Sequence, residues 1–148
     1  MRTMPLSLKH GVTYIVQGGP YRACPNGVFG VKMAAEIDAP CDVSVPTQDF
    51  SVPGIEDATK GLKETVKAVL AGKNVYVGCM GGIGRTGLML ALLAKAFGES
   101  DPVRYVRATY YSHAVETEAQ KQFIAEFKIP LSVRLRIWLK RKLPAKCC

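Results

Sequence analysis

Residues 74–98 constrain the fold more than any other part of the chain. They begin with the short apolar run NVYV at 74–77, continue through a glycine-rich segment, and end in the long apolar run 85–97, which Gly98 follows. The first run is typical of a buried strand, and the second of a buried helix that stops at a glycine. A strand, a glycine-rich loop and a helix in this order indicate an α/β unit.

The flanking segments extend this pattern. Residues 11–17 and 41–45 favour strands, residues 28–35 are ambiguous, and residues 55–71 have apolar residues at helical spacing. Further helices are predicted at 102–111, with Asp101 as N-cap, and at 116–127. We therefore expect an α/β fold with one domain, whose central, mainly parallel sheet is flanked by helices. We assign residues 1–130 to this domain and 131–148 to a basic C-terminal tail.

The cysteines and histidines do not form a disulfide framework or a zinc motif. The five cysteines include no Cys-x-x-Cys pair, and the two histidines, His10 and His113, have no ligand-type neighbours at zinc spacing. We expect reduced thiols and no metal or cofactor, with Cys24 and Cys41 in the core and both histidines at the surface or in packing. Because no apolar run has the length of a membrane span and the start lacks a signal-peptide pattern, we expect a cytoplasmic protein.

The net charge of +8 is concentrated at the C-terminal end. The last eighteen residues contain no acid, and their cations are Arg134, Arg136, Lys140, Arg141, Lys142 and Lys146. Such a field favours an anionic substrate or partner. For the tail itself we favour packing against the domain over contact with a membrane surface or nucleic acid, with Cys147 and Cys148 as lipidation sites in the membrane alternative. We expect a monomer.

The loop between the predicted strand and helix has the composition of an anion site. Its glycines allow the backbone N–H groups to converge, and the start of the helix adds a positive dipole. The expected phosphate-binding residues are Met80, Gly81, Gly82, Ile83, Gly84 and Arg85, which directly follow Cys79. An ordinary glycine-rich turn with a buried cysteine is the alternative interpretation.

Three side chains at this loop suggest nucleophilic catalysis on phosphorus. The positive surroundings favour the thiolate of Cys79, which is the nucleophilic form of a cysteine. The planar guanidinium of Arg85 is suited to hold two phosphoryl oxygens at once. Thr86 is placed to donate a hydrogen bond to the sulfur when it leaves the resulting phosphocysteine.

The motif Cys-x5-Arg-Thr at 79–86 resembles that of the protein tyrosine phosphatase superfamily. Residues 47–53 resemble the aspartate loop of small dual-specificity phosphatases, which makes Asp49 the expected general acid, with Asp42 and Asp57 as alternatives. Residues 114–120 resemble the segment whose glutamine positions water in some relatives. Gln120 is the candidate for that role, and a solvated helix residue is the alternative. The resemblance covers residues 45–127.

The resemblance implies a phosphatase of phosphotyrosine and of phosphoserine or phosphothreonine in protein substrates. The chain departs from relatives at Gly78, where they usually have a histidine that helps keep the thiol ionised. This departure motivates one alternative, a pseudophosphatase that binds phosphorylated partners without turning them over. An RNA 5′-phosphatase is a second alternative, disfavoured because Gly84 stands where those relatives usually have asparagine.

Overall fold

The computed structural model describes residues 2–8 and 11–142. A five-stranded sheet with the order β1-β2-β5-β3-β4 forms its centre. β1 (Arg2–Ser7) pairs antiparallel with β2 (Thr13–Pro20), and every other pairing, which involves β5 (Val75–Cys79), β3 (Phe29–Ala34) and β4 (Val43–Thr47), is parallel. The expected α/β fold with a mainly parallel sheet is confirmed. The carboxyl ends of four strands therefore meet at one edge of the sheet, where Cys79 ends β5.

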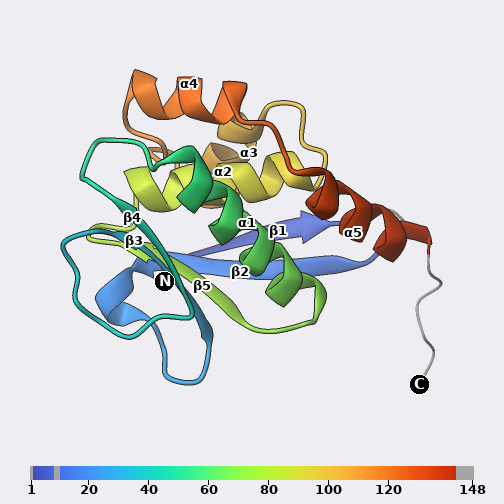
Figure 1. Cartoon of the computed structure of the whole chain (residues 1–148), viewed down its shortest axis with the longest axis horizontal. Coiled ribbons are helices and arrows are strands. Elements are labelled where there is room, and N and C mark those ends of the chain that lie inside the picture. The colour runs from blue at the N-terminus through green and yellow to red at the C-terminus, as the bar shows by residue number, and fades with distance from the viewer. Residues whose placement is uncertain (1, 9–10, 143–148) are drawn as a thin grey trace.

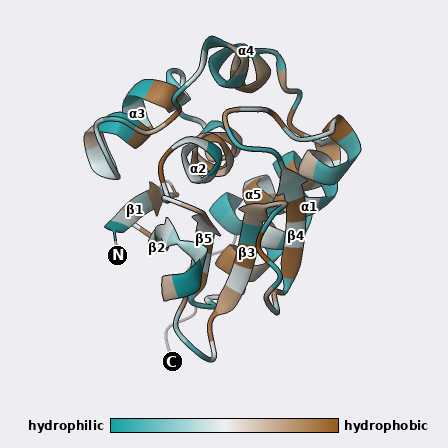
Figure 2. Cartoon of the chain, turned by 90° about the vertical axis from the view of Figure 1, so that its left-hand side faces the viewer, coloured by the Kyte–Doolittle hydropathy of each residue, from teal (hydrophilic) through white to brown (hydrophobic). Residues whose placement is uncertain are grey.

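The helices that cover the sheet are arranged around one central helix, α2 (Figure 1). α2 contacts β5 and β3 and also packs against the other four α-helices. Figure 2 shows α2 end-on, with α3 on its left, α1 on its right and α4 above it. The helices are α1 (Ile55–Leu70), α2 (Gly84–Ala96), α3 (Pro102–Thr109), α4 (Glu118–Glu126) and α5 (Leu131–Lys142), and a 3-10 turn, η1 (Tyr21–Ala23), follows β2.

The central position of α2 explains why its sequence is apolar all round. Every residue from Gly84 to Ala94 is buried. A helix enclosed on all sides has no face that needs polar side chains. The consequence for the site is that the first turn of α2 is held rigidly beside the end of β5.

Two strands were not predicted with certainty from the sequence. The ambiguous residues 28–35 form β3, and β1 was not predicted at all. In β1, Met4 and Leu6 are fully buried on one face, but Pro5 between them weakens the strand pattern. β1 lies at the edge of the sheet, which is where a proline is tolerated in a strand.

The expectation of two core cysteines was wrong for one of them. Cys41 is exposed and Cys24 is partly buried. Cys41 lies in the irregular segment before β4, because the strand predicted to begin at residue 41 begins at Val43. His113 is exposed, which agrees with the surface position, one of the two positions predicted for it. His10, Lys146, Cys147 and Cys148 lie outside the described residues.

The C-terminal segment forms a helix that packs on the domain. α5 contacts α1 and α2, and Val133 and Ile137 are buried in that contact. This agrees with the packing favoured from the sequence, while the division into a domain and a tail stays a prediction. Among residues 2–8 and 11–142, the structure contains no helix that combines the length and the apolar character of a membrane span.

Candidate active site

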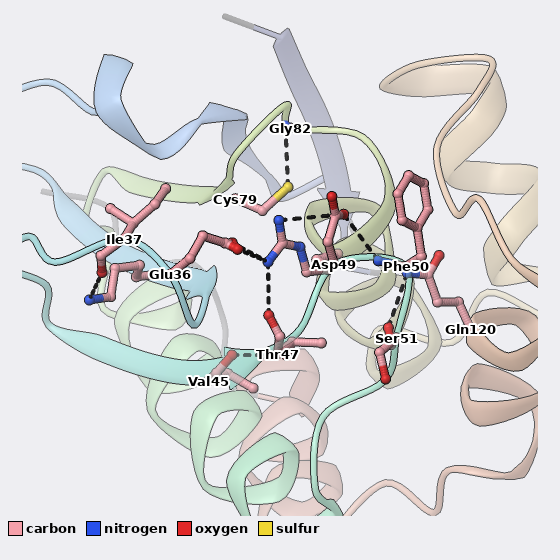
Figure 3. A network of polar contacts seen from close by, with 12 residues as sticks. Glu36, Ile37, Val45, Thr47, Asp49, Phe50, Ser51, Cys79, Gly82 and Gln120 are labelled. Atoms are coloured by element: carbon pink, nitrogen blue, oxygen red, sulfur yellow. Dashed lines mark hydrogen bonds and ion pairs between the residues drawn. The ribbon is translucent and has the colours of Figure 1, made fainter.

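The loop between β5 and α2 curls around the sulfur of Cys79. The side chain of Cys79 is buried, and its Sγ accepts a hydrogen bond of 3.2 Å from the backbone N–H of Gly82 (Figure 3). Gly82 has a φ of 74°, and a Cβ there would collide with the backbone of Gly19. Only glycine fits this turn, because the backbone is left-handed and closely approached at once.

The rest of the loop passes from exposed positions at its start to buried positions at its end. Met80 and Gly81 are exposed, Ile83 is partly buried, and Gly84 is buried. A Cβ at Gly84 would collide with the side chain of Glu116, so the segment that precedes α4 packs closely against the end of the loop. The expected anion-binding residues therefore form one continuous turn between the nucleophile and the start of α2.

Arg85 is held at this turn by three partners. Its side chain is only 2% exposed. Nη1 donates to both carboxylate oxygens of Glu36, at 2.5 and 3.0 Å, and to the carbonyl oxygen of Thr47 at 2.8 Å. Nη2 lies 3.5 Å from Oδ1 of Asp49. The guanidinium is thus fixed in orientation before any substrate binds, which lowers the entropy cost of using it.

Glu36 is a site residue that the sequence analysis missed. It follows β3 in the chain, and β3 pairs in parallel with β5, so both strands end at the same edge of the sheet. The available signal was a carboxylate that directly follows a strand, where that strand pairs with the strand that ends at Cys79. It was not recognised because residues 28–35 were left ambiguous.

Asp49 faces Arg85 from the loop that follows β4. Its side chain is 55% exposed, and its Oδ1 also accepts a hydrogen bond of 3.0 Å from the backbone N–H of Phe50. Phe50 has a φ of 58°, an unusual conformation for a bulky residue that often marks a functional turn. The predicted acid and the predicted clamp are therefore brought together.

The two alternative acids have other surroundings. Asp42 accepts a hydrogen bond of 2.8 Å from the backbone N–H of Gly30, which ties the segment before β4 to β3. Asp57 is exposed in the first turn of α1, where a carboxylate favourably meets the helix dipole. Neither forms an ion pair with Arg85 among the described residues. Asp49 is the better candidate.

Two buried polar atoms at the site have no hydrogen-bond partner within the described part of the chain. They are Nε of Arg85 and Oγ1 of Thr86. Thr86 is fully buried, and no bond from its hydroxyl to Cys79 is present, so its expected contact with the sulfur stays a prediction. Buried polar groups are otherwise almost always paired, so two unpaired ones beside a nucleophile indicate a place for a polar ligand.

Gln120 links α4 to the loop that carries Asp49. Its side-chain oxygen accepts hydrogen bonds from the backbone N–H groups of Glu116 and Thr117, at 2.8 and 3.2 Å. Its amide nitrogen donates to the carbonyl oxygen of Ser51 at 3.1 Å. Because Gln120 is fully buried, the solvated alternative is wrong. The side chain holds the acid loop in position, and a role in positioning water stays a prediction.

Tyr110 supports the turn from the opposite side. Its hydroxyl donates a hydrogen bond of 2.7 Å to the carbonyl oxygen of Gly82. Burial raises the pKa of Tyr110, and the neighbouring Cys79 raises it further, so the hydroxyl keeps its proton at neutral pH. Gly82 is therefore held through its N–H by the sulfur and through its carbonyl by Tyr110.

The glycine that precedes the nucleophile has a packing reason. A Cβ at Gly78 would lie 2.7 Å from Cα and 2.9 Å from N of Tyr21, and 3.0 Å from the carbonyl oxygen of Gly19. All three are backbone atoms of the segment that passes from β2 into η1, so they cannot move aside as a side chain would. The histidine of relatives would not fit beside this backbone.

Comparison with known proteins gives matches centred on the same region. The family described as "Polymorphic toxin system, DSP-PTPase phosphatase" matches residues 30–98, which include Glu36, Asp49, Cys79 and Arg85. Uncharacterized protein MJECL20 of Methanocaldococcus jannaschii is 41% identical over 83 residues, which are 56% of this chain and 56% of that protein. A second protein of that organism, MJ0215, is 41% identical over 83 residues, or 52% of its length. The matched segment thus spans about half the length of these curated relatives.

Solved structures share the architecture. Tk-PTP in its active form is 28% identical with a TM-score of 0.59, over 66% of this chain and 76% of that one. Kinase associated phosphatase (KAP), with its catalytic-site cysteine replaced by serine, has a TM-score of 0.60 over 86% of this chain and 93% of that one. At 16% identity, the second likeness shows the fold alone. Residues 30–98 therefore match a phosphatase family of the dual-specificity type, and the chain has the fold of small protein tyrosine phosphatases.

Proposed function

We propose that the chain is a cysteine-dependent phosphatase that hydrolyses phosphotyrosine, and phosphoserine or phosphothreonine as well, through a phosphocysteine intermediate. One observation carries the proposal. The turn that returns the N–H of Gly82 to Sγ of Cys79 also presents a buried, oriented Arg85 whose Nε has no partner among the described residues. A nucleophile and a bidentate cation at a helix N-terminus form a site for a phosphoryl group.

In the first step, the thiolate of Cys79 attacks phosphorus. The S–P bond forms while the ester O–P bond breaks, and Asp49 gives its proton to the departing oxygen. Arg85 holds the phosphoryl oxygens in line for this displacement. Because Oδ1 of Asp49 lies 3.5 Å from Nη2 of Arg85, a phosphate held by the guanidinium has its ester oxygen near the carboxyl group.

In the second step, water cleaves the phosphocysteine. Asp49, now a carboxylate, takes a proton from the attacking water, the new O–P bond forms, and the S–P bond breaks to return the thiolate. The hydroxyl of Thr86, which has no partner within the described chain, is the donor that we assign to the departing sulfur.

Two exposed apolar side chains support an aromatic phosphate ester as substrate. Phe50, which follows Asp49, is 59% exposed, and Met80, which follows Cys79, is 41% exposed. Figure 3 shows the ring of Phe50 beside Asp49. Rigid aromatic and flexible thioether side chains at the rim of a site favour contact with a phenyl ring.

A phosphate-binding module without turnover is the second candidate function. This alternative was based on Gly78, which stands where relatives have a histidine. The close approach of the Tyr21 backbone gives a packing reason for this glycine, so its presence does not by itself indicate a loss of activity. The experiment is phosphate release from an aryl phosphate, with a phosphotyrosine peptide and a 5′-triphosphorylated RNA as further substrates. Turnover that Cys79→Ser abolishes supports the proposal. Tight peptide binding by both forms with no release by either would establish the module instead.

Asp49→Asn should distinguish proton donation to the leaving group from nucleophilic attack by Cys79. We expect turnover of an alkyl phosphate, whose leaving group needs a proton, to fall by roughly 10² to 10⁴-fold, while an activated aryl phosphate is affected less. The control is Asp57→Asn, which removes an equal charge from the exposed start of α1. Equal losses for both kinds of ester, or a larger loss in the control, would move the acid role to another residue.

A further inference from the structure

Helix α5 has a second apolar face that the domain does not cover. Val133 and Ile137 are buried against the domain. Four other apolar side chains remain exposed: Leu131 by 80%, Leu135 by 52%, Trp138 by 52% and Leu139 by 45%. With 3.6 residues per turn, these four fall on one stripe along the helix, on the side away from Val133 and Ile137.

Exposed cations flank this stripe. Arg134 lies along one side of it and Arg136 along the other, and both are exposed. No acidic residue follows Glu126 in the sequence. Arg141 is not part of this charge, because it donates to the carbonyl oxygen of Phe97 and anchors α5 to the end of α2.

An open groove beside the stripe is also lined by apolar side chains and cations. Its volume is about 810 Å³, and its apolar walls include Phe127, Ile129, Leu135 and Trp138. Lys128 and Arg134 are the exposed cations that line it, and no carboxylate does so among the described residues. The surface therefore combines apolar contact area with positive charge.

We infer that this face of α5 docks the protein on an anionic lipid bilayer. The helix would lie in the plane of the surface, with its leucines and Trp138 among the upper acyl chains and its cations at the lipid phosphates. Tryptophan and the long stems of arginine and lysine suit this boundary, because each has an apolar body and a polar end. The sequence favoured packing over membrane contact, and the structure gives α5 a separate face for each.

The cations and the apolar stripe of this face together argue against other occupants. A second copy of the chain would bring cations against cations, with no acid on either surface to offset them. Nucleic acid would satisfy the cations, but it would leave an exposed leucine stripe without a role. A bilayer that contains acidic lipids accounts for both features.

Docking would leave the catalytic loop in solution. The loop lies at the first turn of α2, and α5 contacts the other end of that helix, as Figure 1 shows. Thirteen residues at 1.5 Å each place the two about 20 Å apart. Changes on α5 should therefore leave hydrolysis of a soluble aryl phosphate unchanged, and this provides a test of folding for each variant.

The test is co-flotation of the full chain with vesicles. We expect binding to phosphatidylcholine vesicles in which about one third of the lipid is phosphatidylserine, and little binding to pure phosphatidylcholine. The double variant Arg134→Gln/Arg136→Gln should weaken binding by about fivefold for each cation removed. Leu135→Ser/Trp138→Ser should weaken it further and should reduce the binding that remains at high salt.

Control variants remove an equal charge, or an exposed apolar side chain, elsewhere on the surface. Lys60→Gln/Lys63→Gln takes two exposed cations from α1, and Ile15→Ser takes an exposed apolar side chain from β2. Both controls should bind vesicles as the parent chain does. If no vesicle is bound, or if the controls lose as much binding as the α5 variants, the inference is wrong.

Two further outcomes would assign the face to another partner. A gel shift with single-stranded RNA that the α5 variants abolish, without vesicle binding, would make it a nucleic-acid surface. A sedimenting dimer that Leu135→Ser/Trp138→Ser dissociates, again without vesicle binding, would make it an interface between copies. Either result overturns the lipid assignment and leaves the phosphatase proposal untouched.

Discussion

Replacing Arg85 by alanine is expected to lower kcat/KM for an aryl phosphate by roughly 10³ to 10⁵-fold. The reason is that a guanidinium binds two oxygens of the transferring phosphoryl group most strongly in the transition state, where the charge of that group is redistributed. Arg85 is already oriented by Glu36 and Thr47, so little entropy is lost when the wild-type protein makes this contact. Steady-state hydrolysis is the measurement.

Arg85→Lys distinguishes geometry from charge. Lysine keeps the charge but loses the planar fork, so we expect activity to remain far below wild type. Arg104→Ala is the matched control, because Arg104 is an exposed arginine on α3. Unfolding curves of all three variants show whether the loss is one of folding. Near-normal activity of a folded Arg85→Ala protein would contradict the assigned role.

Gly78→Ala is expected to destabilise the fold by about 2 to 3 kcal/mol, and Gly78→His by at least as much. The added Cβ would lie 2.7 Å from Cα of Tyr21, and the backbone from β2 into η1 would have to shift to relieve the contact. Restoring the histidine of relatives should therefore damage this protein. Chemical denaturation measures the free energy of unfolding.

Gly81→Ala is the control for stability. A Cβ at Gly81 meets only the side chain of Ile83, at 3.9 Å, so its cost should be within about 0.5 kcal/mol. If Gly78→His were as stable as the parent and more active, the packing explanation would be wrong. Gly78 would then be a catalytic deficit, as the sequence comparison with relatives suggested.

The part of the site that could be predicted from the sequence is the part encoded locally. Cys79, the glycines and Arg85 are within one strand–loop–helix unit, and the strand and helix patterns around them are strong. Asp49 was found through the resemblance of its loop to that of relatives, and the ion pair with Arg85 agrees with the choice. Its role as an acid still depends on the mutation described above.

What could not be predicted depends on contacts between distant segments. Glu36 reaches Arg85 across 49 residues, and Gln120 reaches Ser51 across 69. Strand β1 exists because β2 pairs with it, and its own pattern is interrupted by Pro5. The exposure of one side of α5 was also hidden, because a sequence does not show which of two apolar stripes the domain will cover.

The most direct test of the account is whether Cys79 becomes phosphorylated during turnover. The protein would be mixed with an aryl phosphate, quenched in acid within the first turnover, and digested for mass spectrometry. We predict one phosphoryl group on the peptide that contains Cys79, more of it in a variant slowed in the second step, and none in Cys79→Ser. Phosphate release without any adduct on Cys79, or an adduct on Cys41 instead, would contradict the mechanism.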